Sequence, residues 1–218
     1  MSIGVIILNW NYGCFLKDAI ESVLNQTRKA NQIVIVDDAS RDNSWEVLRQ
    51  YKIKPIIHSQ RIGTVKSLNE AMEQINTDLV LRLDADDMLK PDALKKLVRA
   101  MEHNPDTGFI YFQAEMVGSV NGITNYPIFK EGVKTWHKKN FVNGSAIFRR
   151  EIWETIKFRE HQQEDYLFFR TAYKKGWKGG LLNEILMTIR YHWEMGHRHN
   201  NTDLTTRTKW LRQKRFIQ

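Results

Sequence analysis

Short apolar runs alternate with amphipathic stretches through the first half of this chain, and this pattern constrains the fold more than any other feature. The runs Ile3–Leu8, Ile33–Val36 and Leu79–Leu83 are each followed by a stretch whose apolar residues recur at helical spacing. Such alternation is typical of βαβ units, whose strands join a largely parallel sheet. The sequence therefore predicts an α/β fold with a Rossmann-like, mostly parallel sheet and flanking helices.

Capping residues, glycine and proline predict the remaining elements. In the first half we expect a strand over 55–57 and helices over 15–25, from Asp42 or Asn43 to about 51, over 63–72, and over 91–101 with Pro91 in the first turn. Beyond Gly108 we expect strands over 109–112, 116–120 and 145–148, a hairpin turn at Asn121-Gly122, and helices over 151–156 and 164–175. The second half is expected to be less regular than the first.

Cysteine content and charge narrow the class of protein. The single cysteine, Cys14, allows no internal disulfide and fits a reducing compartment. The early apolar runs are too short for a membrane span and lack the charged start of a signal peptide, so we expect a cytoplasmic protein. The net charge of +8 comes from residues 130–218, a basic region that suits nucleic acid, anionic lipid, a polyanionic substrate or simple solvation.

Three aspartates follow the run Leu79–Leu83 within four positions. Because side chains alternate along an extended strand, we expect Asp84 and Asp86 to point to the same side, and Asp87 to point away and cap the next turn. Two carboxylates on one side offer the oxygen ligands that Mg²⁺ and Mn²⁺ prefer. A loop with capping aspartates is the alternative, since turns also collect this residue.

Two further acidic pairs lie at the ends of predicted elements. Asp37-Asp38 follows the strand at 33–36, where an acidic side chain can accept hydrogen bonds from a nucleobase or ribose. Glu164-Asp165 begins a predicted helix, where the helix dipole alone stabilises carboxylates. Placed opposite a bound sugar nucleotide, one of these two could accept the proton of an attacking hydroxyl.

Taken together, these segments resemble the inverting family 2 glycosyltransferases, which have a GT-A fold. Residues 5–27 resemble the opening strand and helix of that family, residues 33–48 its nucleotide-binding unit, and residues 77–94 its Asp-x-Asp segment. Residues 143–156 and 164–176 resemble its acceptor-side segments. The resemblance runs from Ile3 to His192 in the expected order, which makes it far more specific than any single motif.

This resemblance implies a single domain over 1–218, with a nucleotide-sugar-binding half (about 1–108), an acceptor and catalytic-base half (about 109–192) and a basic C-terminal tail (about 193–218). It implies transfer of a sugar, with inversion, from a nucleotide-sugar donor to a hydroxyl of a glycan or lipid-linked acceptor. A UDP-sugar is the first choice of donor, Mn²⁺ or Mg²⁺ the expected cofactor, and no nucleic acid partner is expected.

The resemblance also implies roles for single residues. Asp38 corresponds to the residue that reads the base, and Trp10 to the aromatic side chain that stacks near it. Asp84 corresponds to a ribose or metal contact and Asp86 to the metal ligand. Asp165 matches the catalytic base.

Near the end of the matched region, Arg190 and His192 resemble an Arg-x-His segment of the family. There the arginine can neutralise phosphate charge, and the histidine can approach the metal or the diphosphate. Purely structural roles for Trp10 and His192 stay open. Arg61 and Lys66 match no family position, and we expect both on the surface.

Residues 207–218 place apolar side chains among basic ones, which predicts either an interfacial helix on anionic lipid or a helix docked on the core. The first would give a peripheral contact with the cytoplasmic face of a membrane. Two other functions stay open. One is a nucleic-acid-binding module that uses the basic C-terminal part, and the other is a sugar nucleotidyltransferase. The second normally needs a glycine-rich phosphate loop, but residues 9–15 contain one glycine.

Overall fold

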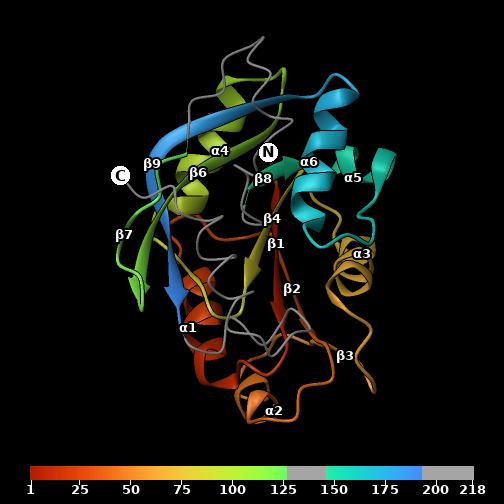
Figure 1. Ribbon diagram of the computed structural model, residues 1–218, viewed down its shortest axis with the longest axis vertical. Coiled ribbons are helices and arrows are strands. Elements are labelled where there is room, and N and C mark those ends of the chain that lie inside the picture. The colour runs from red at the N-terminus through yellow and green to blue at the C-terminus, as the bar shows by residue number, and fades with distance from the viewer. Residues whose placement is uncertain (127–145, 193–218) are drawn as a thin grey trace, which may run out of the picture.

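The structure, a computed structural model, describes residues 1–126 and 146–192. Within these residues nine strands form one mixed sheet (Figure 1). The strands are β1 (Ile3–Asn9), β2 (Gln32–Asp37), β3 (Ile56–Ile57), β4 (Leu79–Asp84), β5 (Met88–Leu89), β6 (Thr107–Gly118), β7 (Gly122–Ile123), β8 (Ile147–Arg149) and β9 (Lys178–Tyr191).

Helices cover both faces of this sheet. They are α1 (Gly13–Leu24), α2 (Ser44–Leu48), α3 (Thr64–Gln74), α4 (Ala93–His103), α5 (Arg150–Ile156) and α6 (Glu164–Lys174). Buried residues of α1, α2 and α4 pack with one face of the sheet, and those of α3, α5 and α6 pack with the other (Figure 1). The fold is therefore the α/β arrangement, with helices on both faces of a sheet, that the sequence predicts.

The strand order brings several strand ends to one edge of the sheet. The order is β3-β2-β1-β4-β8-β6-β9-β5, with β7 paired to β6. Strands β1 to β4 are parallel, whereas β8 runs antiparallel to both β4 and β6. Asn9 pairs with Asp37, and Leu8 pairs with Asp84, so β1, β2 and β4 end side by side. Open α/β sheets bind their ligands at this edge.

Strand β1 lies between β2 and β4, and all of its residues are buried. Val5 and Ile7 belong to the apolar cluster that includes α1 and α4, whereas Ile6 and Leu8 belong to the cluster that includes α3. A strand that is covered on both faces needs apolar side chains on both. This requirement explains why its sequence is a continuous apolar run rather than an alternating one.

The predicted elements of the first half are present, with ends that differ by a few residues. In the second half, β6 is one continuous strand where two were predicted over 109–112 and 116–120. It pairs in parallel with β9 along its length, and the register shifts around Phe112 and Gln113. Strand β9 was not predicted, because its sequence contains a Gly-Gly pair and no clean alternation. Pairing between distant segments therefore determines this part of the sheet.

Helix capping differs from expectation at α4 and agrees with one of the two expected residues at α2. The residue before α4 is Asp92, so Pro91 precedes the helix instead of lying in its first turn. At α2 the capping hydrogen bond comes from Asp42, whose Oδ1 accepts the Ser44 N–H at 3.0 Å. Its Oδ2 accepts the Gly13 N–H at the start of α1, at 2.7 Å, so one carboxylate serves two helices.

The membrane-related expectations are tested only in part. In the part of the chain that the structure describes, no helix combines the length and the apolar character that crossing a membrane would require. The segment 207–218, for which we expected an interfacial or a docked helix, lies outside the described residues.

Candidate active site

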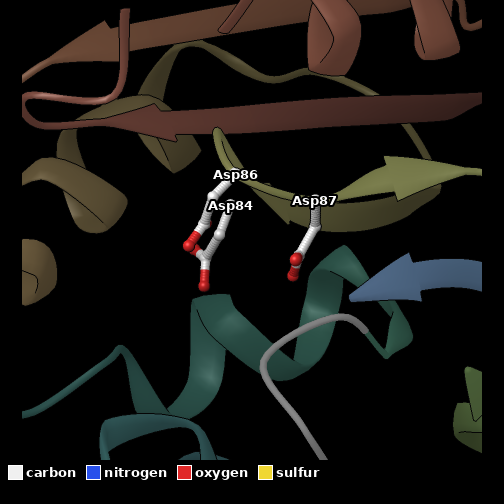
Figure 2. A group of neighbouring side chains, drawn as sticks. All are labelled: Asp84, Asp86 and Asp87. Atoms are coloured by element: carbon white, nitrogen blue, oxygen red, sulfur yellow. The ribbon is translucent and has the colours of Figure 1, made fainter. Parts of the chain in front are cut away.

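Three aspartates gather where β4 ends. Asp84 is the last residue of the strand, and a turn follows in which the Asp87 N–H donates to the Asp84 carbonyl oxygen at 3.0 Å. One carboxylate oxygen from each of Asp84, Asp86 and Asp87 lies within 4.8 Å of the others. Figure 2 shows these three side chains. Asp86 and Asp87 are 4% and 7% exposed. Like charges this close and this buried need a compensating cation or hydrogen-bond donors.

The expectation that Asp87 points away was wrong. Alternation of side chains holds only while the chain is extended, and here the chain leaves the strand at Asp84 and turns. The turn brings the Asp87 carboxylate to the same side as those of Asp84 and Asp86 (Figure 2). Its Oδ1 also accepts the backbone N–H of Arg190 at 3.1 Å, which ties the cluster to β9. Asp87 therefore completes the cluster.

A buried arginine joins this cluster to α6. The Arg82 side chain donates from Nε and Nη2 to Asp84 Oδ1, at 3.1 and 3.0 Å, and from Nη1 to Glu164 Oε1 at 2.7 Å. Burial by itself would lower the pKa of Arg82, but the charges of Asp84, Glu164 and Asp165 outweigh burial and raise that pKa. Arg82 therefore stays charged and compensates part of the acidic cluster.

Asp165 lies in the first turn of α6, next to Glu164. Its Oδ1 accepts the backbone N–H of Tyr166 at 2.7 Å. Arg82 donates hydrogen bonds to both Glu164 and Asp84, so the acidic pair Glu164-Asp165 lies beside the aspartate cluster at the end of β4. The role of Asp165 as a base stays a prediction.

His192 lies directly after β9 and approaches the same cluster. Its Nε2 is 3.2 Å from Asp86 Oδ2, and its ring packs beside those of Tyr12 and Phe15, with centroid distances of 5.3 and 4.8 Å. Within the described part of the chain, its buried Nδ1 has no hydrogen-bond partner. The structure thus brings together the two residues that were predicted as metal ligands.

The Arg190 side chain lies against α1. Its Nη2 donates to Asp18 Oδ2 of α1 at 2.5 Å, and its guanidinium carbon lies 5.1 Å from the centre of the Phe15 ring. Both contacts hold the side chain against α1. The predicted contact of Arg190 with the donor phosphates stays a prediction.

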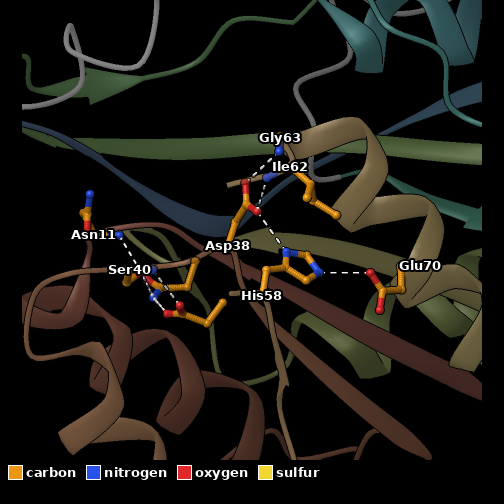
Figure 3. A network of polar contacts seen from close by, with 9 residues as sticks. Asn11, Asp38, Ser40, His58, Ile62, Gly63 and Glu70 are labelled. Carbon is orange, nitrogen blue, oxygen red and sulfur yellow. Dashed lines mark hydrogen bonds and ion pairs between the residues drawn. The ribbon is translucent and has the colours of Figure 1, made fainter. Parts of the chain in front are cut away.

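The second acidic strand end is held by the chain itself. Asp38 accepts the backbone N–H groups of Ile62 and Gly63, each at 2.8 Å, and its Oδ1 lies 2.9 Å from His58 Nδ1 (Figure 3). His58 Nε2 in turn lies 2.9 Å from Glu70 Oε2. Burial by itself would lower the pKa of His58, but its contacts with Asp38 and Glu70 outweigh burial and raise that pKa.

The neighbouring carboxylate, Asp37, shapes the turn after β2. Its carboxylate accepts hydrogen bonds from Asn9 Nδ2 at 2.6 Å and from the Ser40 N–H at 2.8 Å. Ser40 Oγ accepts the Asn11 N–H at 2.8 Å (Figure 3). The acidic pair at the end of β2 thus connects this turn with β1 through Asp37, and with the segment before α3 through Asp38.

Trp10 follows β1 at the same edge of the sheet and is partly buried. The guanidinium carbon of Arg61 lies 3.5 Å from the centre of its ring, which is a close cation–π contact. Arg61 and Lys66 are both exposed, as expected. The structure adds that Arg61 covers the aromatic side chain that was predicted to stack near a base.

The donor atoms at the end of β4 fit a divalent cation. Carboxylate oxygens of Asp84, Asp86 and Asp87 come within 4.8 Å of one another, with His192 Nε2 beside Asp86. Mn²⁺ and Mg²⁺ take such oxygen-rich ligand sets, and Mn²⁺ also accepts an imidazole nitrogen. The cluster therefore suits the cofactor that the resemblance implies.

The comparison with known families decides the kind of protein. Residues 4–157 match the family described as Glycosyl transferase family 2. The chain belongs to this family.

Curated relatives of this family 2 glycosyltransferase carry the same kind of name. An uncharacterised glycosyltransferase of Nostoc sp. is 39% identical over 117 residues, which cover 51% of this chain and 36% of that protein. The putative glycosyltransferase EpsE of Bacillus subtilis is 26% identical over 207 residues, which cover 86% of this chain and 72% of that one. The chain therefore spans little more than a third of the first relative.

Solved structures share the fold. S. aureus TarS 1–349 in complex with UDP-GlcNAc matches with a TM-score of 0.76 at 19% identity, over 88% of this chain and 59% of that one. The mannosyltransferase PcManGT from Pyrobaculum calidifontis, in complex with GDP-Man and Mn²⁺, matches with a TM-score of 0.68 at 17% identity, over 85% and 56%. The predicted GT-A fold is confirmed.

Two residues of this site were not singled out from the sequence. Arg82 was assigned no role, although an arginine within the otherwise apolar run Leu79–Leu83 signals a buried partner. His58 gave no signal, because its partners Asp38 and Glu70 lie on other elements.

Proposed function

We propose that this family 2 glycosyltransferase moves a sugar from a nucleotide-sugar donor to a hydroxyl group of a glycan or lipid-linked acceptor, with inversion at the anomeric carbon. The observation that carries the proposal is the joining of two acidic groups by one buried arginine. Arg82 contacts Asp84 at the end of β4 and Glu164 at the start of α6. A cation-binding cluster and a candidate base thereby share one site.

The cluster at the end of β4 would hold Mn²⁺ or Mg²⁺ through Asp86, Asp87 and His192, with Asp84 contacting the ribose or the metal. When bound, the cation supplies positive charge for the diphosphate that leaves the sugar. The gathering of three carboxylates within 4.8 Å supports this role, since such a cluster is costly without a cation. The matching PcManGT structure contains Mn²⁺.

Asp165 would accept the proton of the acceptor hydroxyl while that oxygen attacks the anomeric carbon from the face opposite the diphosphate. A single displacement of this kind inverts the configuration. The base must be ionised before it accepts the proton. Its place in the first turn of α6, and the positive charge of Arg82, both favour the ionised carboxylate.

We propose a nucleotide sugar as donor, first of all a UDP-sugar, with Trp10 and Asp38 near the base and Arg190 near the phosphates. TarS has been solved with UDP-GlcNAc and PcManGT with GDP-Man, and both support a donor of this class. We place the protein in the cytoplasm or peripherally on the cytoplasmic face of a membrane, where a lipid-linked acceptor would be presented. The basic residues of 207–218 support the membrane contact.

The first test measures thermal unfolding with UDP-GlcNAc, UDP-galactose, GDP-mannose and dTDP-glucose, each with and without Mn²⁺. A ligand that binds the native state raises the midpoint. We expect one nucleotide to raise it, and only when Mn²⁺ is present. The shift should persist in Asp165→Asn. No shift with any donor, with or without Mn²⁺, would contradict the proposed donor site.

A second test measures release of the nucleotide from the stabilising donor, with water as the acceptor. Asp165→Asn should lower this rate by about 100- to 10,000-fold, which is the usual contribution of a general base. Asp106→Asn is the matched control, because the Asp106 side chain is 83% exposed. Near-normal turnover in Asp165→Asn would refute the assignment of the base.

A further inference from the structure

We propose that Arg82 and Glu164 form a positioning pair that sets the first turn of α6, and with it Asp165, at a fixed place relative to the carboxylate cluster. This inference rests on the proposed function, because it assigns Arg82 and Glu164 a part in the same transfer. The proposed function gives Glu164 no part in the reaction and gives Arg82 only an electrostatic one, in which its charge favours the ionised form of Asp165.

The alternation of side chains along β4 places Arg82 on the face of the sheet that α6 covers. Residues two apart on a strand share a face, so Val80, Arg82 and Asp84 point the same way. Val80 belongs to the apolar cluster that contains Phe168 and Phe169 of α6. Arg82 thus lies on the face of β4 whose Val80 belongs to the same apolar cluster as α6.

The guanidinium group connects two elements that are far apart in sequence. Nε and Nη2 donate to Asp84 Oδ1, and Nη1 donates to Glu164, which is 82 residues away along the chain. The Arg82 side chain is 10% exposed, and those of Asp84 and Glu164 are 29% and 16% exposed. Solvent screens such pairs less than it screens surface pairs, so they can hold a geometry.

Helix α6 is held at two places by this arrangement. Phe168 and Phe169, one turn after the start of the helix, are each 2% exposed and pack on the core. Glu164 holds its first residue to β4 through Arg82. Asp165 lies between these attachments, so its carboxylate has little freedom to move relative to the cluster.

A planar guanidinium suits this task better than an ammonium group. Its donors form a rigid fork that can hold two carboxylates in defined directions, whereas lysine is a flexible point charge. Misplacing a reacting group by about 1 Å can lower a rate on the order of 100-fold. Loosening the pair should therefore lower kcat even when the donor site is intact.

The experiment compares Glu164→Gln and Arg82→Lys with the unchanged protein. Glu164→Gln removes a charge but keeps the shape, and Arg82→Lys keeps the charge but loses the fork. Glu151→Gln is the matched control, since Glu151 lies in the first turn of α5 and is exposed. Each protein is tested for its thermal midpoint, for its Mn²⁺-dependent shift with UDP-GlcNAc or whichever donor in the panel stabilises it, and for kcat and KM of nucleotide release.

We expect Glu164→Gln to lower kcat by about 10- to 100-fold while the KM for the donor and the donor-dependent shift stay within about twofold, and Glu151→Gln to change neither. Arg82→Lys should lower kcat similarly, and the double variant should lose little more than either single variant. A normal kcat in Glu164→Gln, beside an inactive Asp165→Asn, would overturn the positioning pair alone. Loss of donor binding in step with kcat, or full additivity, would also overturn it. If Asp165→Asn is as active as the unchanged protein, the proposed function fails and the pair fails with it.

Discussion

The two acidic strand ends of this protein lie at one edge of one sheet but are compensated differently. At the end of β2, Asp38 accepts two backbone N–H groups and contacts His58. At the end of β4, three aspartates come together, and Arg82 donates to Asp84 alone among them. Asp38 is surrounded by donors, whereas the second group, although Arg82 and the Arg190 N–H donate to it, places three carboxylates within 4.8 Å of one another.

This difference separates two uses of the same residue type. A carboxylate that accepts several N–H groups stabilises the fold in its ionised form. A cluster of three carboxylates whose charge is compensated only in part should instead be stabilised further when a cation binds. Asp38 should therefore matter first for the segment that precedes α3, and Asp86 first for binding a metal.

The largest effect should come from Asp86→Asn. It should abolish the Mn²⁺-dependent rise in thermal midpoint and lower nucleotide release by more than about 100-fold, because a divalent cation stabilises the leaving diphosphate by several kcal/mol. Without metal, its midpoint should equal or exceed that of the unchanged protein, since one like charge has gone. Asp92→Asn, outside the cluster, is the control. A full Mn²⁺ response in Asp86→Asn would refute the cation site.

The second effect should come from Asp38→Asn, which weakens the acceptor of the Ile62 and Gly63 N–H groups. We expect a loss of about 1–3 kcal/mol in the free energy of unfolding, because these hydrogen bonds end on a charged, buried group. The change is measured by denaturant unfolding without ligands, with exposed Asp106→Asn as control. An unchanged free energy of unfolding would show that Asp38 does not stabilise the fold, and the proposed difference between the ends of β2 and β4 would fail.

A smaller effect should appear in the dependence of stability on pH. Since the folded-state pKa of His58 is raised above its ordinary value of 6.5, its stabilising contribution is full below that value. It is lost as the pH rises through the folded-state pKa. The deficit of His58→Gln should therefore be larger at pH 5.5 than at pH 8.

The size of this pH effect should stay below that of Asp38→Asn, because the backbone donors to Asp38 remain in the histidine variant. Denaturant unfolding at both pH values measures it. His103→Gln is the control, as His103 is exposed and its Nδ1 lies beside the backbone carbonyl oxygen of Arg99. A deficit that is the same at both pH values would show that the contribution of His58 does not depend on its charge.

The smallest effect should come from Arg61→Ala. Its cation–π contact with Trp10 is exposed on the arginine side, so the loss of stability should be about 0.5–1 kcal/mol. The same variant uncovers the Trp10 ring, which we place near the nucleobase. The KM for the donor in nucleotide release should therefore change. Lys66→Ala is the control. An identical donor KM in both variants would place the base elsewhere.

The first half of the fold could be predicted because its signals are local. Continuous apolar runs such as Ile3–Leu8 mark strands that are buried on both faces, and helical periodicity between them marks the crossovers. Strand β9 could not be predicted in this way. Its fourteen residues become a strand by pairing with β6, across shifts in register that no local pattern encodes.

In the candidate site, too, local features could be predicted and contacts between distant elements could not. Acidic residues at strand ends were visible in the sequence, and the family resemblance supplied their order. The direction of Asp87 was predicted wrongly, because the turn after β4 ends the alternation. The contact between Arg82 and Glu164 was not predicted, because it joins elements on either side of a long segment of chain.

By itself, the sequence determined the family, the α/β layering and the strand ends that carry acidic residues, because these depend on residue type and short-range spacing. Only the tertiary structure decided which carboxylates accept hydrogen bonds from distant backbone N–H groups and which lie close to other carboxylates. Hydrogen bonds and charge act over a few ångströms in space, and Asp38, Asp84 and Glu164 find their partners on other elements or across a turn.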